Sequence, residues 1–169
     1  NNEHFEFHGQ WDLVMMSDPE FANGLGLNIH IRTKLVRFWS YIEVAAVRIG
    51  HDTLEVKGSV DGTLEYWINY EYQGDLNSGG LGGFPVTVKQ PMKSKQIYEI
   101  DLSHVYPGQS MQIQTFKEFV AVKVMNGTQE AFGNTVGMSG NYNTGKTLAR
   151  DGVTALNDFN ELGNEWQVL

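Results

Sequence analysis

The sequence predicts an all-β protein, built as an antiparallel β-sandwich with short helical turns near the ends of the chain. Three observations lead to this prediction. Short runs rich in Val, Ile, Tyr, Phe and Trp alternate with polar residues, turn residues separate these runs, and no stretch has the apolar spacing of a three-turn amphipathic helix. Many short strands with close turns favour a sandwich over a fold in which strands and helices alternate.

The predicted strands follow one another at short intervals along the whole chain. In order they are residues 11–16, 27–32, 43–49, 54–57, 63–72, 84–89, 96–102, 111–116 and 119–125. Residues 158–162 are the best candidate for a helical turn, because Gly163 follows them as a C-cap. The glycine-rich stretch 76–83 is predicted to be a loop.

Two turn dipeptides predict hairpins. Asp61-Gly62 lies between two predicted strands, and Asn126-Gly127 follows the last one. Both dipeptides tolerate the positive φ angles that a two-residue type I′ turn requires.

The predicted strand at residues 63–72 shows a clear alternation of side chains. Because successive side chains point to opposite faces of a sheet, its even-numbered residues, which include Tyr70 and Tyr72, are predicted to face the core. Its odd-numbered residues, which include Trp67, are predicted to face the solvent.

Composition bounds the class of protein. The chain has 169 residues, and 12 Lys and Arg against 20 Asp and Glu give it a formal net charge of −8. This acidic balance argues against a nucleic-acid partner and against docking on an anionic membrane. No apolar run approaches the roughly 18 residues of a spanning helix, so no membrane insertion is expected. With 41% hydrophobic residues, residues 1–169 are expected to fold as a single domain.

The sequence has no cysteine. Disulfides, cysteine-based zinc sites, iron–sulfur clusters and thiol nucleophiles are therefore excluded. The chain begins at Asn1 without a signal peptide, and we expect it to be a piece of a larger secreted protein.

Two groups of residues are candidates for metal or catalytic chemistry. His4, Glu6 and His8 share one face of an extended strand, where they could bind a divalent metal, although a solvated polar face is the favoured interpretation. Glu99 and Asp101 share a strand face as in some glycosidases, but an ordinary exposed strand is again favoured. The sequence has no nucleophile elbow, phosphate loop or dinucleotide fingerprint, and we expect a protein that is not an enzyme.

A calcium site is predicted near the C-terminus. Asn141 and Asn143 present alternating amide oxygens ahead of Gly145, and Asp151 adds a charged ligand downstream. Because the loop holds one acid, calcium affinity is expected to be modest, and Asx-turns are the alternative role of these asparagines.

Aromatic residues and a sequon give two further candidate sites. Trp39, Tyr41 and Trp67 could form an exposed platform for sugars or proteins, although scattered exposed aromatics are common and need no function. Asn126-Gly127-Thr128 is an N-glycosylation sequon in a predicted turn, which mildly favours secretion.

The C-terminal stretch Gly137-Met138-Ser139-Gly140-Asn141-Tyr142-Asn143 resembles the glycine–Cys–glycine–Asn–aromatic–Asn signature of von Willebrand factor type D domains. Trp11 and Ser139 stand where members of that family usually carry cysteine, so this chain would be a cysteine-free, divergent member. Further likeness to the opening, middle and closing motifs of the family lies in residues 5–14, 44–50, 53–56, 150–152 and 160–168.

The resemblance implies an extracellular or cell-surface β-sandwich with calcium ligands at Asn141 and Asn143. The family's role is mostly architectural: assembly, adhesion, or support of a neighbouring domain. Without cysteine, assembly would be noncovalent, through strand edges or an aromatic patch. We therefore expect a non-enzymatic structural or adhesive module whose partners are other proteins or other domains of its parent chain. The alternative is a carbohydrate-binding β-sandwich that binds glycans, and a glycosidase ranks third.

Overall fold

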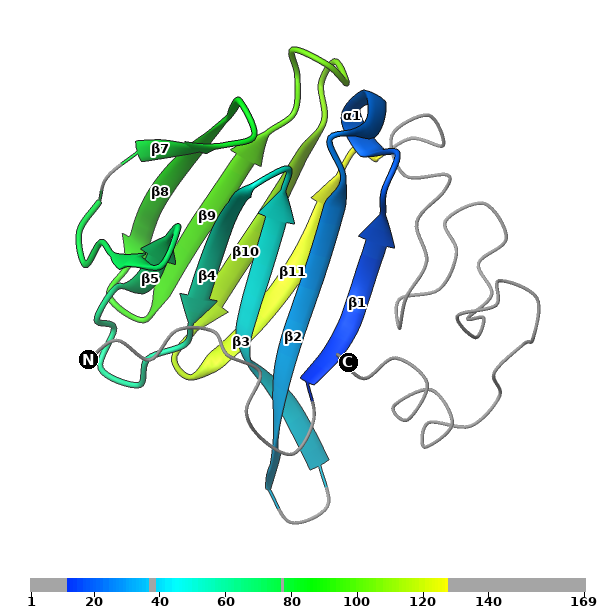
Figure 1. Ribbon diagram of the computed structural model, residues 1–169. Helices are drawn as coiled ribbons and strands as arrows, with labels where there is room; N and C mark the ends of the chain where they lie inside the picture. The colour runs from blue at the N-terminus through cyan, green and yellow to red at the C-terminus, as the bar shows by residue number, and fades with distance from the viewer. Residues whose placement is uncertain (1–11, 37–38, 77, 128–169) are drawn as a thin grey trace.

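The protein is an all-β sandwich of two antiparallel sheets, as the computed structural model of residues 12–36, 39–76 and 78–127 shows (Figure 1). The predicted fold class is therefore confirmed. The first sheet contains β1 (Asp12–Asp18), β2 (Leu27–Val36), β3 (Trp39–Ile49), β4 (Asp52–Lys57), β5 (Glu65–Ile68) and β6 (Glu71–Tyr72). The second contains β7 (Ser78–Leu81), β8 (Phe84–Met92), β9 (Lys95–Asp101), β10 (Ser110–Phe116) and β11 (Phe119–Met125).

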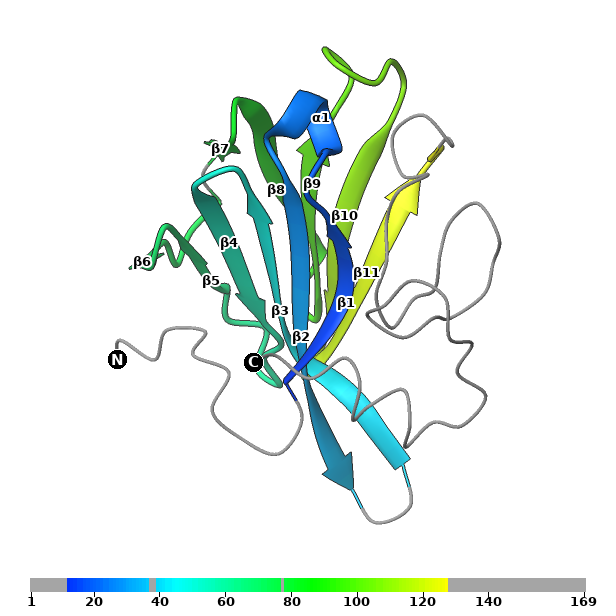
Figure 2. The ribbon, with the colours of Figure 1, turned by 45° about the vertical axis from the view of Figure 1, so that its right-hand side comes forward.

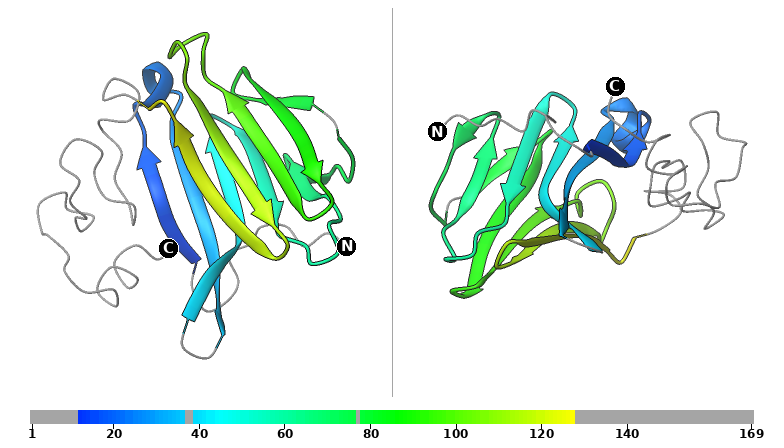
Figure 3. Two further views of the ribbon diagram at one scale, coloured as in Figure 1. Left: turned by 180° about the vertical axis from the view of Figure 1, so that it is seen from behind. Right: turned by 90° about the horizontal axis from the view of Figure 1, so that it is seen from below.

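Each sheet is an up-and-down meander, because every strand pairs with the strand that follows it in the chain. The two sheets lie face to face (Figures 2 and 3), with β3 against β11 and β4 against β7. The short turn α1 (Phe21–Gly24) joins β1 to β2 at one end of the sandwich. The β8–β9 and β10–β11 turns lie at the other end (Figure 1).

The core lies between the sheets and follows the alternation of the strands. In β9 and β10, buried and partly exposed residues alternate without a break, as expected for strands with one face on the core. Tyr66 of β5 and Tyr98 of β9 are both fully buried, and their ring centroids lie 5.1 Å apart. Aliphatic residues from both sheets, such as Ile29, Val47 and Ile100, complete the cluster.

Two local predictions were wrong. The predicted loop at 76–83 contains β7, which pairs with β8 from Ser78 to Leu81. Glycine is a poor strand former, but a Cβ at Gly79 would lie 2.8 Å from Ile68 Cδ1, so the close approach of the other sheet favours glycine here. The turn α1 was not predicted; it forms because Phe21 is buried in the core and the backbone N–H of Ala22 donates to Tyr106 Oη at 2.8 Å.

The predicted single strand at residues 63–72 was also wrong, because the chain reverses within it. Asn69 and Tyr70 have φ values of 50° and 70° and form the tight turn between β5 and β6. Asn69 Oδ1 accepts a hydrogen bond from the Thr53 backbone at 2.9 Å, and its Nδ2 donates to Asp52 at 3.0 Å. The predicted core face is confirmed for Leu64 and Tyr66, which are buried. It is wrong for Tyr70 and Tyr72, which are exposed, and the predicted solvent-facing Trp67 is only 9% exposed.

The strands on either side of Asp61-Gly62 pair as predicted, but the loop that connects them is longer than the predicted two-residue turn. The last register pair of β4 and β5 is Lys57 with Glu65. Asp61 organises the loop by accepting hydrogen bonds from Ser59 Oγ and the Thr63 backbone. These hydrogen bonds lower the pKa of Asp61, and the bond from Ser59 has the largest effect. The second predicted turn, at Asn126-Gly127, has its following residues outside the described part of the chain.

Backbone contacts tie the two sheets together at both ends. At the end away from α1, the Ser59 N–H donates to Lys117 O at 2.8 Å, and the Lys117 N–H donates to Ser94 O at 2.9 Å. At the α1 end, the Gly82 N–H donates to Asp52 Oδ2 at 2.7 Å. This bond, with that from Asn69, lowers the pKa of Asp52.

Among the described residues, no helix has the length and apolar character needed to cross a bilayer.

Candidate functional site

The β5–β6 hairpin and the residues after it present an exposed aromatic surface, which we call the tyrosine surface. It consists of Tyr70, Glu71, Tyr72, Asp75 and Leu76. Tyr70, Tyr72 and Leu76 are 50%, 55% and 58% exposed, among the highest values for large apolar side chains in the described residues. Because large exposed side chains at one place mark contact sites more often than scattered ones do, this surface is the leading candidate site.

The Tyr72 ring is held in one orientation from three sides. Its centroid lies 5.7 Å from the Trp67 ring, and its hydroxyl donates to Leu64 O at 3.1 Å. A Cβ at Gly74 would lie 2.7 Å from the Tyr72 ring, so the glycine lets the chain pass directly beside it. An exposed side chain that is already immobile loses little entropy on binding, which makes Tyr72 a preorganised contact residue.

Tyr70 occupies a strained backbone position at the tip of the hairpin. Its φ of 70° lies in the left-handed region, where glycine is the usual residue and a bulky side chain is uncommon. Such strain costs about 1–3 kcal/mol and is concentrated at functional sites. Tyr70 thus presents its ring at the exposed tip of the hairpin.

The charged residues of the tyrosine surface itself, Glu71 and Asp75, are both acidic. From residue 58 to residue 88 the sequence has no Lys, Arg or His, and its acids are Asp61, Glu65, Glu71 and Asp75. Glu71 and Asp75 are exposed beside the two tyrosines in sequence. The tyrosine surface therefore combines aromatic faces with negative charge, which suits a cationic or amphipathic partner.

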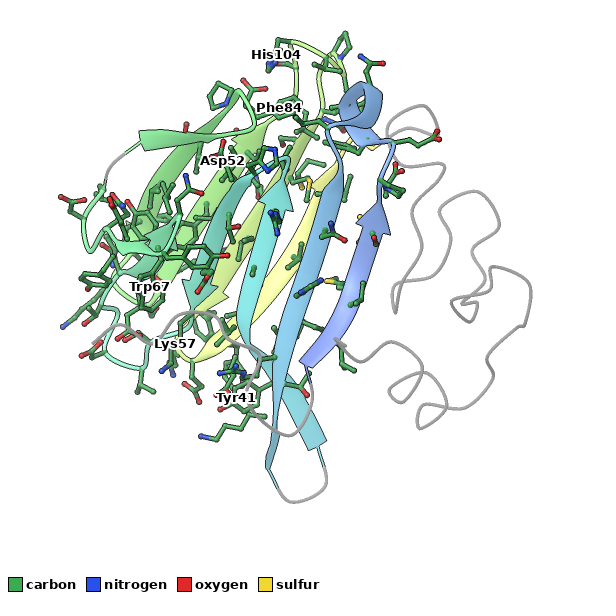
Figure 4. The ribbon with its side chains drawn as sticks, in the orientation of Figure 1. Tyr41, Asp52, Lys57, Trp67, Phe84 and His104 are labelled. Carbon is green, nitrogen blue, oxygen red and sulfur yellow. The ribbon has the colours of Figure 1, made fainter. Side chains whose placement is uncertain are left out.

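The predicted platform of Trp39, Tyr41 and Trp67 is not assembled as expected. Trp67 is nearly buried beside Tyr72, and Tyr41 packs edge-on against Phe119 of the other sheet at 4.8 Å. Figure 4 shows Tyr41 and Trp67 on different elements, at separate places on the sandwich. The Trp39 side chain lies outside what the structure describes. Trp67 instead packs beside the Tyr72 ring. This contact was not predicted, because residues 63–72 were predicted to form one strand.

Glu99 and Asp101 lie on β9 with their side chains directed away from the core, as the favoured interpretation of an ordinary strand expects. Glu99 Oε2 accepts a hydrogen bond from Gln112 Nε2 at 2.7 Å. Asp101 Oδ1 accepts hydrogen bonds from the Ser103 hydroxyl and backbone, which lower the Asp101 pKa. Both carboxylates are thus engaged with neighbours on their own sheet or loop.

The predicted calcium ligands, Asn141, Asn143 and Asp151, lie outside the described residues, as do His4, Glu6 and His8 and the predicted helical turn at 158–162. Within residues 12–36, 39–76 and 78–127, no three His, Asp or Glu side chains gather as a metal site.

Asn126 of the predicted sequon is exposed at the end of β11, with a φ of 56°. Its Nδ2 donates to Gly108 O at 3.3 Å, a long bond that leaves the amide at the surface. Thr128, the third residue of the sequon, lies outside the described part of the chain.

Fold and site together define an all-β sandwich that exposes a rigid, acidic aromatic surface on one hairpin. No protein-family model matches the sequence, and no curated protein matches it. The residues themselves must therefore carry any assignment of function.

Proposed function

We propose that this chain is a non-enzymatic structural or adhesive module of an extracellular or cell-surface protein. It contacts protein partners, or neighbouring domains of its parent chain, without covalent links. The tyrosine surface is the single observation that carries this proposal, because Tyr70, Tyr72 and Leu76 are large side chains that remain 50–58% exposed together at one edge of the sandwich. The resemblance to von Willebrand factor type D domains supports the same role.

Adhesion of cells that display the full chain tests this proposal. Such cells are expected to adhere to one another, or to surfaces coated with matrix proteins, more strongly than cells that display an unrelated β-sandwich. Tyr70→Gly is expected to reduce adhesion by about tenfold, because it removes an exposed ring from the tyrosine surface. Adhesion is measured under flow, and thermal unfolding of the purified variants is measured in parallel.

Met125→Ser is the matched control, because Met125 is an exposed apolar residue, at 37% exposure, at the end of β11 and outside the tyrosine surface. Adhesion equal to that of the unrelated sandwich would overturn the proposal. So would an equal loss of adhesion in Met125→Ser and Tyr70→Gly.

Calcium is part of the same proposal, with Asn141, Asn143 and Asp151 as ligands. A ligand that binds only the folded state raises its melting temperature. Millimolar calcium is therefore expected to raise the melting temperature of the wild-type chain by a few degrees, and Asn141→Ala is expected to abolish this shift. Differential scanning calorimetry measures both. An equal shift in wild type and variant would remove Asn141 from the site, and no shift in wild type would remove calcium from the proposal.

Carbohydrate binding is the second candidate, because the fixed and exposed ring of Tyr72 is a stacking surface of the kind that sugars use. It is distinguished by the coating in the adhesion experiment. Adhesion to glycan-coated but not to protein-coated surfaces, lost in Tyr72→Ser, would favour it over the leading proposal.

A further inference from the structure

We infer that the partner of the tyrosine surface is a second copy of this chain, which docks through a separate basic surface on the β8–β9 and β10–β11 turns. This inference rests on the proposed function and names its partner. The second surface, which we call the lysine surface, consists of Met92, Lys93, Lys95, Phe116 and Lys117.

The lysine surface is continuous across three strands. Lys95 of β9 is the register partner of both Met92 on β8 and Phe116 on β10. Met92 and Phe116 are 55% and 48% exposed, although both are large apolar side chains. Lys117 Nζ lies 5.4 Å from the centroid of the Phe116 ring. One ammonium group thus lies near an exposed apolar ring, and Lys95 lies between Met92 and Phe116 on the sheet.

The two surfaces are complementary in charge and alike in apolar content. Residues 89–95 contain three lysines and no acid, while Glu118 follows Lys117 and Asp61 lies in the β4–β5 loop that packs on both turns. This basic run follows directly on residues 58–88, which contain four acids and no base. Charge is therefore segregated along the chain, although the chain as a whole is acidic.

The two surfaces lie on different elements. Asn69 in the β5–β6 turn donates to Asp52 at the start of β4, whereas the Tyr72 hydroxyl donates to Leu64 O, so the tyrosine surface follows the β6 edge of the first sheet toward the β4–β5 loop. A Cβ at Gly62 in that loop would lie 2.1 Å from Lys93 O, so the lysine surface adjoins the same loop. Figure 2 shows β6 at the outer edge of the first sheet, and Figure 1 shows the β8–β9 and β10–β11 turns away from α1.

Contact between the tyrosine surface of one copy and the lysine surface of another brings together three kinds of favourable interaction. Lysine ammonium groups can lie over the faces of Tyr70 and Tyr72, an interaction worth about 0.5–1 kcal/mol at exposed sites. Glu71 and Asp75 attract the same lysines, and Met92 and Phe116 cover Leu76. Each surface is small, so a single contact is weak. Because the contact joins two different surfaces, it can close into a dimer that uses both surfaces of each copy, or continue into a ring or an open chain.

The net charge of −8 opposes association through general repulsion. At an ionic strength of about 0.15 M, charges farther apart than about 8 Å are largely screened, whereas charges in contact are not. The experiment is therefore made at physiological ionic strength.

Sedimentation velocity of the full chain over a range of concentrations tests this inference. The wild-type chain is expected to self-associate in the high-micromolar range. Glu71→Lys with Asp75→Lys makes both surfaces basic, and Lys93→Glu with Lys117→Glu makes both acidic. Each double variant alone is expected to associate at least tenfold more weakly than wild type, because like charges then face each other.

Mixing the two double variants is the decisive step. Each still carries one wild-type surface, and these two surfaces are complementary, so the equimolar mixture is expected to regain association. This recovery also shows that neither variant is misfolded. A wild-type chain that stays monomeric, or a mixture that stays monomeric while wild type associates, would overturn the inference.

Failure here is distinguishable from failure of the proposed function. A monomeric chain that still supports adhesion to protein-coated surfaces, with loss in Tyr70→Gly, keeps the proposed function and replaces the second copy with another protein. A monomeric chain without adhesion overturns both.

Discussion

Replacing Gly62 with alanine is expected to destabilise the folded chain by about 3 kcal/mol or more. Gly62 has a φ of 79°, and a Cβ at this position would lie 2.1 Å from the Lys93 carbonyl oxygen. That oxygen belongs to the backbone of the β8–β9 turn, which cannot move without losing its hydrogen bonds from Gln90 and Gln96. Urea unfolding followed by tryptophan fluorescence measures the change.

Gly83→Ala is the matched control for backbone strain. Gly83 has a similar φ of 86°, but a Cβ there would have nothing within 4 Å. Its substitution should therefore show the cost of a positive φ alone, about 1–2 kcal/mol. Equal losses in the two variants would mean that the contact between the β4–β5 loop and the β8–β9 turn is not tight in solution.

Opposite effects are expected from removing the hydroxyls of two neighbouring core tyrosines. Tyr66 Oη donates to Asp75 O at 2.7 Å, so Tyr66→Phe is expected to lower the free energy of unfolding by about 1 kcal/mol. The Tyr98 hydroxyl is fully buried and has no hydrogen-bond partner among the described residues. Tyr98→Phe is therefore expected to raise the free energy of unfolding by about 1 kcal/mol, since it removes a polar group that was desolvated without compensation.

Tyr66→Phe and Tyr98→Phe both keep the two aromatic rings, whose centroids lie 5.1 Å apart. A difference between the two variants therefore reports the hydroxyl groups and not the packing of the rings. Burial also raises the pKa of Tyr98, in agreement with a hydroxyl that stays neutral in the core. Chemical denaturation of wild type and both variants gives the two differences. Destabilisation by Tyr98→Phe would show that this hydroxyl is bonded in solution, for example to a buried water molecule.

Much of the sandwich can be predicted from the chain alone. The alternation of apolar and polar residues in β9 and β10 reflects one buried and one outer face, and it places Tyr98, Ile100 and Ile113 in the core without any knowledge of their neighbours. The predicted strands at 27–32 and 43–49 correspond to parts of β2 and β3 for the same reason. Elements of this kind depend on local periodicity, which the sequence carries directly.

The candidate site could not be predicted in the same way. Periodicity continues through residues 63–72, and Asn69-Tyr70 is not a usual hairpin dipeptide, so the pattern indicates one strand. The reversal depends on Asp52 and Thr53, which hold the Asn69 side chain from β4. Once the chain turns there, Tyr72 faces the solvent and Trp67 lies beneath it. Asn69 was the available signal, because asparagine tolerates positive φ.

The amino-acid sequence alone is therefore enough to establish the class of fold, the absence of cysteine chemistry and the segregation of acids and lysines along the chain. Tertiary packing sets which aromatic residues are exposed, makes β7 from a glycine-rich stretch, and packs the β4–β5 loop of the acidic run against the β8–β9 turn of the basic run. The physical reason is that periodicity and charge belong to each residue, whereas exposure, strain and register depend on side chains that only folding brings together.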